Sequence, residues 1–237
     1  IVEESTGPFC NNIVMVRKKD GKPRMCIDFR KLNANTKFDA WPLARIDEAL
    51  DMLGKAKVIS TLDQKSAFWS IAMHNEDKEK TAFGTRKFGL LQFKRMPFGL
   101  KNATATYSRA VAHVLRGLVW QSCVAYVDDT IVMGEDHEDH LNKLDEVLKR
   151  FSLNNVSIKL DKCFFACPET EYVGHIIQVG EGIRADDKKV KKLLEMKRPE
   201  VVSEIKTFIG MAAYYRRFIK DFAHILYPLR KIENVFK

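Results

Sequence analysis

Short apolar runs rich in β-branched residues alternate along the chain with stretches of helical periodicity. Strands are expected at 13–16, 25–29, 56–62, 122–127 and 130–133, and as a pair between 156 and 179. Helices are expected at 43–53, 103–118, 137–153, 186–196 and 203–218, where apolar side chains recur every three or four residues. The 237 residues therefore mix strands and helices, and they suffice for one large domain or two or three smaller subdomains.

Positive charge adds a first indication of function. The chain has 40 Lys and Arg against 31 Asp and Glu, a formal net charge of +9, which favours a polyanionic partner such as nucleic acid. Residues 181–237 hold 14 Lys and Arg against 8 Asp and Glu and so supply +6 of this charge. A small basic helical module of this kind is typical of proteins that grip a nucleic-acid backbone.

The cysteines and the first residues of the chain indicate the cellular compartment and the extent of the sequence. The five cysteines are scattered and odd in number, which predicts a reducing compartment and no disulfide framework. Cys163, Cys167 and His175 lack the pair spacing of a zinc site, so we interpret these cysteines as packing residues. No apolar run is long enough to span a membrane. Because Ile1-Val2-Glu3-Glu4 resembles neither a signal peptide nor an initiator, we expect a fragment.

The strongest candidate chemistry is Tyr126-Val127-Asp128-Asp129, two adjacent carboxylates between two predicted strands. An acidic hairpin turn in solvent is the simplest interpretation of an isolated Asp-Asp pair. Two carboxylates this close repel each other, and a bound divalent cation would remove the repulsion. Asp63 ends the predicted strand 56–62, a position common both for metal ligands and for caps.

A basic hairpin is predicted near the N-terminus, with Asp20-Gly21 as its turn. It is either a solvated loop that resists aggregation or a movable clamp for phosphates. Its cations are Arg17, Lys18, Lys19, Lys22 and Arg24.

Taken in order, several motifs resemble the reverse transcriptase domain of gypsy-type long-terminal-repeat retrotransposons, and they cover nearly the whole chain. A lone Tyr-x-Asp-Asp would be a weak signal, but the ordered series is very specific. The matching runs are Asp28-Phe29-Arg30-Lys31-Leu32-Asn33, Pro42-Leu43 with Arg45-Ile46-Asp47, Leu62-Asp63, Lys80-Thr81-Ala82-Phe83, Met96-Pro97-Phe98-Gly99-Leu100 with Asn102-Ala103, Tyr126-Val127-Asp128-Asp129, Gly174-His175 with Glu181-Gly182-Ile183, and Tyr214-Tyr215-Arg216-Arg217-Phe218-Ile219.

The resemblance implies an α+β right-hand polymerase fold. Fingers, truncated at their N-terminus, are expected at 1–42 and 71–102. The palm, an antiparallel sheet with helices on one face, is expected at 43–70 and 103–180. A helical thumb is expected at 181–237.

The implied activity is that of an RNA-directed and DNA-directed DNA polymerase, which transfers a nucleotide from a dNTP to a primer 3′-hydroxyl. Two Mg²⁺ ions, for which Mn²⁺ could substitute, would assist the transfer. By motif matching, Asp63, Asp128 and Asp129 are the metal ligands, because hard cations prefer carboxylate oxygen. Lys162, with Lys159 as a competitor, matches the lysine that protonates pyrophosphate.

The resemblance also assigns binding residues. Phe68 matches the aromatic residue that excludes a ribose 2′-hydroxyl by a clash. The dNTP-binding set is Lys18, Arg24, Gln64, Ala67, Phe68, Phe98 and Gly99. The primer and template set is Tyr126, Val127, Val173, Gly174 and Arg30.

Some positions depart from the family pattern. Gln64 and Trp69 are unexpected and could alter packing of the nucleotide pocket, and Thr104 replaces a usual proline at a helix start. A catalytically silent nucleic-acid-binding or scaffold subunit is therefore the alternative function, and a decayed remnant that folds poorly is a third. Intact acidic motifs argue against both.

The partners implied by the resemblance are an RNA or DNA template, a DNA or tRNA-type primer and dNTPs, with no membrane. RNase H and integrase regions of the same polyprotein are expected as neighbours, and a dimer is left open. Localisation to cytoplasmic virus-like particles follows from the resemblance alone.

Overall fold

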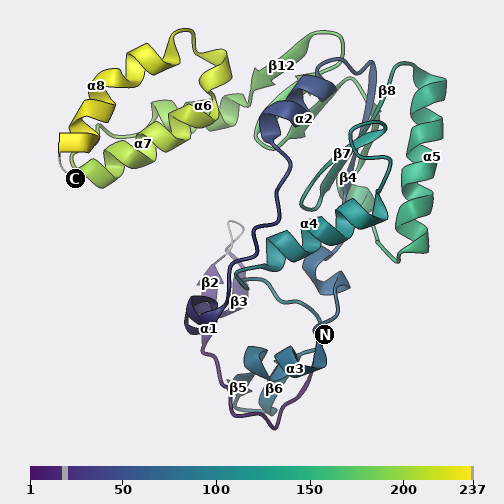
Figure 1. Ribbon diagram of the computed structural model, residues 1–237, viewed down its shortest axis with the longest axis vertical. Helices are drawn as coiled ribbons and strands as arrows, with labels where there is room; N and C mark the ends of the chain where they lie inside the picture. The colour runs from purple at the N-terminus through teal and green to yellow at the C-terminus, as the bar shows by residue number, and fades with distance from the viewer. Residues whose placement is uncertain (18–20, 236–237) are drawn as a thin grey trace. The chain divides into compact units, whose positions relative to one another are not determined.

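The computed structural model describes residues 1–17 and 21–235 (Figure 1). The chain divides into two compact units. The first comprises Ile1–Met52 and Lys57–Cys167, and the second comprises Leu53–Ala56 and Pro168–Lys237. Strands and helices occur in both, which confirms the predicted α+β class.

The centre of the first unit is a four-stranded antiparallel sheet in the order β7-β8-β4-β9. Two of its strands, β7 and β8, form the hairpin predicted around the paired carboxylates. The four strands are β7 (Cys123–Tyr126), β8 (Asp129–Gly134), β4 (Val58–Asp63) and β9 (Phe164–Cys167).

Two helices contribute to the core of this sheet (Figure 1), α4 (Ala103–Val114) and α5 (His137–Leu153). The core includes Leu62 and Val132 from the strands, Tyr107 from α4, and Val147 with Phe151 from α5. The apolar stripe predicted for 137–153 gives these helix bounds, whereas α4 ends four residues before the predicted Leu118. The interior is therefore closed on the helix side of the sheet.

Shorter elements surround this centre in the first unit. β2 (Ile13–Arg17) and β3 (Pro23–Ile27) form the predicted ribbon, of which the turn residues 18–20 lie outside the described residues. Helix α2 (Ile46–Leu53) starts three residues later than predicted. The remaining elements are β1 (Val2–Glu4), α1 (Arg30–Asn35), η1 (Ala67–Ser70), α3 (Asn75–Lys78), η2 (Glu79–Thr81), β5 (Phe83–Thr85), β6 (Gly89–Phe93) and η3 (Leu160–Lys162).

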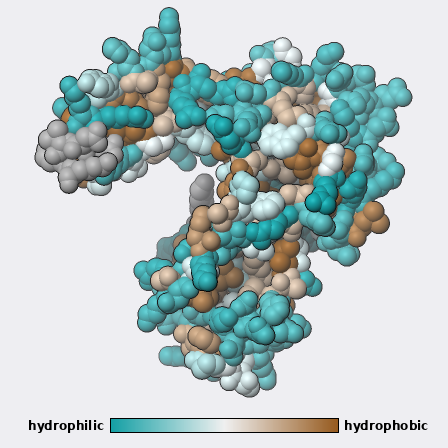
Figure 2. All heavy atoms as spheres, in the orientation of Figure 1, coloured by the Kyte–Doolittle hydropathy of each residue, from teal (hydrophilic) through white to brown (hydrophobic). Residues whose placement is uncertain are grey.

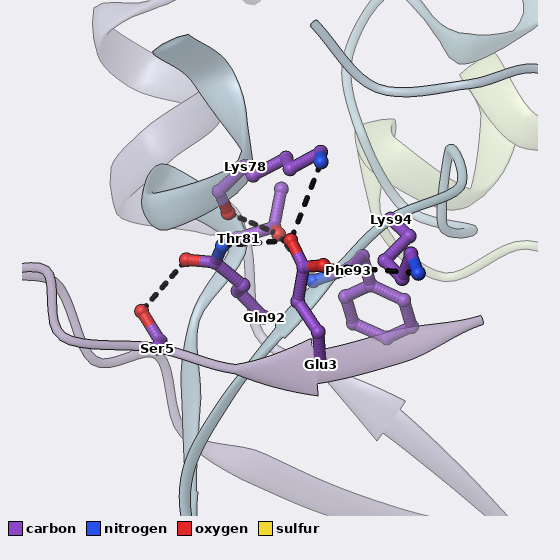
Figure 3. A network of polar contacts seen from close by, with 7 residues as sticks. All are labelled: Glu3, Ser5, Lys78, Thr81, Gln92, Phe93 and Lys94. Atoms are coloured by element: carbon purple, nitrogen blue, oxygen red, sulfur yellow. Dashed lines mark hydrogen bonds and ion pairs between the residues drawn. The ribbon is translucent and has the colours of Figure 1, made fainter. Parts of the chain in front are cut away.

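The strand β1 was not predicted, and a polar network explains its place beside β6 (Figure 3). Glu3 accepts a hydrogen bond of 3.0 Å from Gln92 and forms an ion pair of 3.3 Å with Lys78. Thr81, which is 1% exposed, donates to the Lys78 carbonyl at 2.6 Å and accepts from the Phe93 amide at 3.0 Å. The network therefore joins β1, β6 and the η2 turn.

The second unit begins with a three-stranded antiparallel sheet in the order β10-β11-β12. Its strands are β10 (Glu169–Tyr172), β11 (His175–Gln178) and β12 (Gly182–Ala185). Helices α6 (Asp187–Leu194), α7 (Val202–Tyr214) and α8 (Phe222–Val235) follow, with η4 (Arg216–Phe218) between the last two. The strand β12 and the helix α8 were not predicted.

The division between the units falls at Cys167 and Pro168, so β10 and β11 belong with β12 and the C-terminal helices. The predicted palm boundary at residue 180 lies later than this division. No disulfide joins the five cysteines, all of which lie in the described ranges. Hydrophilic side chains cover most of the face in Figure 2. Of the helices in the described ranges, none is long and apolar enough to cross a membrane.

Candidate active site

The strand register brings two of the three predicted carboxylates together. Asp63, the last residue of β4, pairs with Asp129, the first residue of β8. Residues directly opposite each other in antiparallel strands share one face of the sheet, so both carboxylates lie on the same face. Asp128 precedes Asp129 in the β7–β8 turn, and its carbonyl accepts a hydrogen bond of 3.2 Å from the Gln64 amide. Backbone contacts therefore fix all three positions at one end of the sheet.

The turn that carries Asp128 is strained. Val127 has a φ of 56°, in the left-handed region that β-branched residues rarely adopt. Such a conformation costs about 1–3 kcal/mol and persists only where the surrounding structure imposes it. Here Tyr126 pairs with Asp129 immediately across the turn. The tight connection forces the two acidic residues to sit side by side beyond the end of β7.

A lysine already faces these carboxylates. The Lys162 ammonium donates to an Asp63 carboxylate oxygen at 3.1 Å. This hydrogen bond raises the pKa of Lys162, and the negative charges of Asp63 and Asp128 raise it further. Lys162 is therefore protonated around neutral pH and lies beside Asp63, while its role toward pyrophosphate stays a prediction. Lys159 instead pairs with Asp161 at 3.4 Å.

The carboxylates have the donor chemistry that Mg²⁺ prefers, since their hard oxygens are exposed or half-buried at the end of the sheet. They do not form a ready-made ligand cage. Within the described ranges, no group of three or more His, Cys, Asp or Glu side chains is gathered closely enough to hold a metal ion. The residues fit the ion in chemistry and in backbone position.

An aromatic cluster lies among the predicted nucleotide-binding residues. The ring centroid of Phe68 is 5.1 Å from that of Phe98, and the ring centroid of Trp69 is 6.1 Å from that of Phe98. The Arg24 guanidinium lies 5.1 Å from the Phe98 ring centre, a cation–π contact between the β3 ribbon and this cluster. The unexpected Trp69 is thus a neighbour of the predicted pocket. Phe98 is 45% exposed and so is accessible to a ligand.

Two members of the predicted nucleotide-binding set lie in the interior. Gln64 is 3% exposed, and both ends of its side-chain amide are hydrogen-bonded within the protein, to Tyr107 and Thr130. The Gln64 side chain is therefore inaccessible to a ligand in this structure. Ala67 is 6% exposed.

The remaining nucleotide-binding predictions differ in position. Gly99 is exposed with a φ of 94°, a conformation that disfavours any side chain, and its carbonyl accepts from the Asn33 side chain at 2.8 Å. Lys18 lies outside the described residues.

In the second unit, the turn between β10 and β11 contains Val173 and Gly174, with φ of 43° and 71°. The Tyr214 hydroxyl donates to the Val173 carbonyl, and the Tyr215 hydroxyl donates to the Gly174 carbonyl at 3.2 Å. The His175 ring is 1% exposed and packs against three aromatic rings, with its centroid 5.2 Å from that of Tyr214, 5.6 Å from that of Tyr215 and 5.7 Å from that of Phe218. Helix α7 and the segment after it therefore hold the predicted primer-binding turn.

Arg30, the last predicted primer or template contact, is 89% exposed at its side chain and pairs with Asp28 at 2.7 Å. Hydrogen bonds from the Arg30 side chain and backbone lower the pKa of Asp28 to about 2. The pair keeps the guanidinium at the surface, where it can contact an anionic ligand.

Sequence reasoning did not find the roles of Tyr107, Tyr214 and Tyr215. Tyr214 and Tyr215 lie in a motif that matches the family. Nothing local to them indicates that each hydroxyl donates to a turn residue 41 positions earlier in the chain. Tyr107 occupies an ordinary core position of a helix. Burial raises its pKa, and the charge of Asp128 raises it further. The one available signal for the role of Tyr107 was the polar residue Gln64 directly after an apolar strand, because a buried polar side chain needs a hydrogen-bond partner.

Solved structures show the class of fold to which this chain belongs. The foamy viral protease-reverse transcriptase in complex with double-stranded DNA matches 99% of this chain and 41% of its own, with a TM-score of 0.85 and 24% identity. The same kind of protein in complex with an RNA/DNA hybrid matches with a TM-score of 0.81 and 24% identity, over 99% of this chain and 31% of its own. The chain has the polymerase fold of reverse transcriptases.

The family model described as reverse transcriptase (RNA-dependent DNA polymerase) matches residues 16–177, and the chain belongs to this family. The retrovirus-related Pol polyproteins from transposons opus and gypsy of Drosophila melanogaster are each 40% identical over 238 residues. These matches cover 98% of this chain and 23% of each polyprotein. The chain thus spans about a quarter of the length of these relatives, and it is similar to their reverse transcriptase region.

Proposed function

We propose that this domain catalyses template-directed DNA synthesis on RNA or DNA templates, by nucleotidyl transfer from a dNTP to a primer 3′-hydroxyl. The observation that carries the proposal is the register that sets Asp63 opposite Asp129 with Asp128 beside them, in a chain of the reverse transcriptase family. Phosphoryl transfer requires positioning and charge neutralisation more than covalent chemistry from the protein. Three carboxylates and one lysine at a strand end are suited to that task.

Asp63 and Asp128 would hold two Mg²⁺ ions, or Mn²⁺ in their place, and Asp129 would be a more peripheral ligand. When bound, the ions would favour ionisation of the primer hydroxyl and stabilise the charge on the leaving oxygens. Lys162 would give a proton to the leaving pyrophosphate, and its ion pair with Asp63 at 3.1 Å supports this role. Its raised pKa keeps that proton available at neutral pH.

The exposed aromatic cluster would receive the nucleotide. Arg24 would bind the triphosphate through its planar fork of donors, together with Lys18. Phe68 would exclude a ribose 2′-hydroxyl, and its contact with Phe98 at 5.1 Å supports a fixed ring position. A residue that cannot move aside selects deoxynucleotides by a steric clash.

Primer and template would contact the turn at Val173 and Gly174, the Tyr126–Val127 segment and Arg30. The foamy viral proteins are in complex with double-stranded DNA and with an RNA/DNA hybrid, which supports both template types. Because the relatives are Pol polyproteins, we also propose that the domain acts beside RNase H and integrase regions, in cytoplasmic virus-like particles, with a DNA or tRNA-type primer.

Primer extension on an RNA template with Mg²⁺ and dNTPs tests the proposal. The wild type should extend the primer, and Asp128→Asn should reduce the rate at least about 100-fold while primer–template binding persists. Asp145→Asn removes the same charge from the surface of α5, where Asp145 pairs with Lys149 at 2.5 Å, and should extend like the wild type.

Equal rates for wild type and Asp128→Asn would show that these carboxylates are not the catalytic centre. Binding of primer–template without any extension by the wild type would favour the alternative function, a catalytically silent nucleic-acid-binding subunit.

A further inference from the structure

Three polar side chains are buried directly beneath the carboxylate end of the sheet. Thr130, Tyr107 and Gln64 are 0%, 2% and 3% exposed. Tyr107 belongs to the apolar core between the sheet and its helices. Polar groups at such positions cost free energy unless they are hydrogen-bonded, so their contacts must account for their presence.

These side chains form one continuous chain of hydrogen bonds. The Tyr107 hydroxyl donates to the Gln64 side-chain carbonyl, and the Gln64 side-chain NH₂ donates to the Thr130 hydroxyl at 3.0 Å. The Gln64 backbone amide also donates to the Asp128 carbonyl at 3.2 Å. One residue, Gln64, thereby joins helix α4, the end of β4, the start of β8 and the acidic turn.

Two members of this hydrogen-bond chain adjoin a carboxylate in the sequence. Gln64 follows Asp63, and Thr130 follows Asp129. Successive side chains in a strand point to opposite faces, so the buried side chains lie on the helix side while the two carboxylates lie on the other face of the sheet. A movement of Gln64 or Thr130 would therefore move the backbone that carries Asp63 or Asp129.

The same chain of hydrogen bonds reaches the predicted nucleotide pocket through Tyr107. The ring centroid of Tyr107 is 5.6 Å from that of Phe68, which in turn packs on Phe98. The Tyr107 ring therefore supports the pocket from below, while its hydroxyl supports the strand ends.

We infer that the Tyr107–Gln64–Thr130 hydrogen-bond chain positions the catalytic carboxylates, so that Gln64 is a positioning residue and not a nucleotide contact. The inference rests on the proposed function, because it assigns these carboxylates to metal binding. Groups that orient the ligands of a metal commonly change metal affinity or activity about 10–100-fold when they are removed. Loss of the Tyr107 hydroxyl leaves the Gln64 side-chain carbonyl buried without a hydrogen-bond donor, and the strand ends must shift to satisfy it.

Tyr107→Phe is the decisive variant because it removes one oxygen and keeps the ring that packs on Phe68. Mn²⁺ binding is measured by electron paramagnetic resonance of the free ion, without nucleotide or primer. We expect Mn²⁺ affinity to fall about 10-fold, and the single-turnover rate of nucleotide addition per folded molecule to fall about 10-fold. The apparent affinity for the dNTP should change less than about two-fold, because the ring and Phe68 remain.

Thr81→Val is the matched control, since it removes a buried hydroxyl with two hydrogen bonds from another part of the first unit (Figure 3). Both variants should lower the melting temperature by about 2–4 °C for each kcal/mol lost. Only Tyr107→Phe should weaken Mn²⁺ binding. Should Tyr107→Phe fail to fold, Thr130→Val removes the other end of the chain and decides the question by the same criterion.

Mn²⁺ affinity and rate equal to those of Thr81→Val in the folded variant would overturn the positioning role and leave only a contribution to stability. A wild type that binds Mn²⁺ but never extends a primer would instead reject the proposed function. The Mn²⁺ measurement still tests the positioning of the carboxylates in that case, so the two failures are distinguishable.

Discussion

Two hairpin turns of this chain place a valine in the left-handed region, yet they are held in different ways. Val127, with φ of 56°, belongs to the acidic turn of the first unit, and Val173, with φ of 43°, belongs to the β10–β11 turn of the second. The acidic turn is fixed by the backbone pairing of β7 with β8 and by the hydrogen bonds of the buried residue Gln64. The other turn is fixed by the hydroxyls of Tyr214 and Tyr215.

The difference follows from what each turn is proposed to do. Metal ligands must keep their positions within fractions of an ångström, and a buried core with backbone hydrogen bonds gives that rigidity. A turn that contacts a primer needs to stay attached to the helices that follow it, and the hydroxyls of Tyr214 at the end of α7 and Tyr215 just after it provide that attachment. We therefore expect changes at the two turns to affect different properties of the protein.

Substitution of either valine by proline should give the largest effects. Equal effects of the two substitutions on the same properties would contradict the comparison. Proline holds φ near −65° and cannot adopt either observed angle. Val127→Pro should lower the single-turnover rate at least about 100-fold, because it displaces Asp128. Val173→Pro should weaken primer–template binding and leave Mn²⁺ affinity unchanged. Rate, primer–template affinity and Mn²⁺ affinity are measured for both variants.

Val127→Gly is the control for the first substitution, since glycine adopts a positive φ without strain. It should lose far less rate than Val127→Pro, and its stability should change by less than about 1 kcal/mol because relief of strain offsets the entropy of glycine. Loss of Mn²⁺ binding in Val173→Pro would show that the two turns are not functionally separate.

The double variant Tyr214→Phe with Tyr215→Phe tests how the β10–β11 turn is held, because it removes both hydroxyls and keeps both rings. Each neutral hydrogen bond contributes about 0.5–1.5 kcal/mol, and Tyr214 is 39% exposed, so the pair should contribute about 1–2 kcal/mol. Hydrogen exchange at the amides of residues 173–175 should then become about 5–30-fold faster.

Tyr227→Phe is the control in the same unit, because Tyr227 on α8 is 57% exposed, and it should leave exchange at this turn unchanged. Unchanged exchange in the double variant would mean that the aromatic packing around His175, and not the hydroxyls, holds the turn.

Much of the fold around these turns could be predicted because it depends on local patterns. The periodicity of 137–153 gives α5 with its observed bounds, and β-branched runs give β4, β7 and β8. The strand β12 was missed because four half-buried residues show no alternation, and α8 was missed partly because it contains Pro228. The strand β1 depends on pairing with β6, about 90 residues later in the chain, which no local pattern reveals.

The candidate site likewise contains residues that the sequence marks and contacts that it does not reveal. The sequence located Asp63, Asp128 and Asp129, since the motif and the ends of apolar runs mark them. It could not locate the partners of Gln64, because Tyr107 and Thr130 lie 43 and 66 residues away along the chain. Contacts of this kind arise only when β4 pairs with β8 and α4 packs on the sheet.

Acid should destabilise the sheet beneath the acidic turn through His140 on α5. Its Nε2 is 2.7 Å from the Ser60 hydroxyl on β4, and Ser60 also accepts from the Ala166 amide on β9 at 2.9 Å. Burial lowers the pKa of His140 from its usual 6.5, with His137 and Lys143 acting in the same direction and Asp139 opposing them. The unfolded chain therefore binds a proton at this residue more readily than the folded one.

The stability that neutral His140 contributes is thus fully present above about pH 6.5 and is lost as the pH falls toward the lower folded pKa, by at most about 1.4 kcal/mol for each pH unit. Urea unfolding at several pH values should show this slope in the wild type and a smaller slope in His140→Gln. His74→Gln removes a histidine whose side chain is 71% exposed and should keep the wild-type slope. If His140→Gln kept it too, acid sensitivity in this range would have to come from other groups, and the sheet under the acidic turn would be insensitive to the charge of His140.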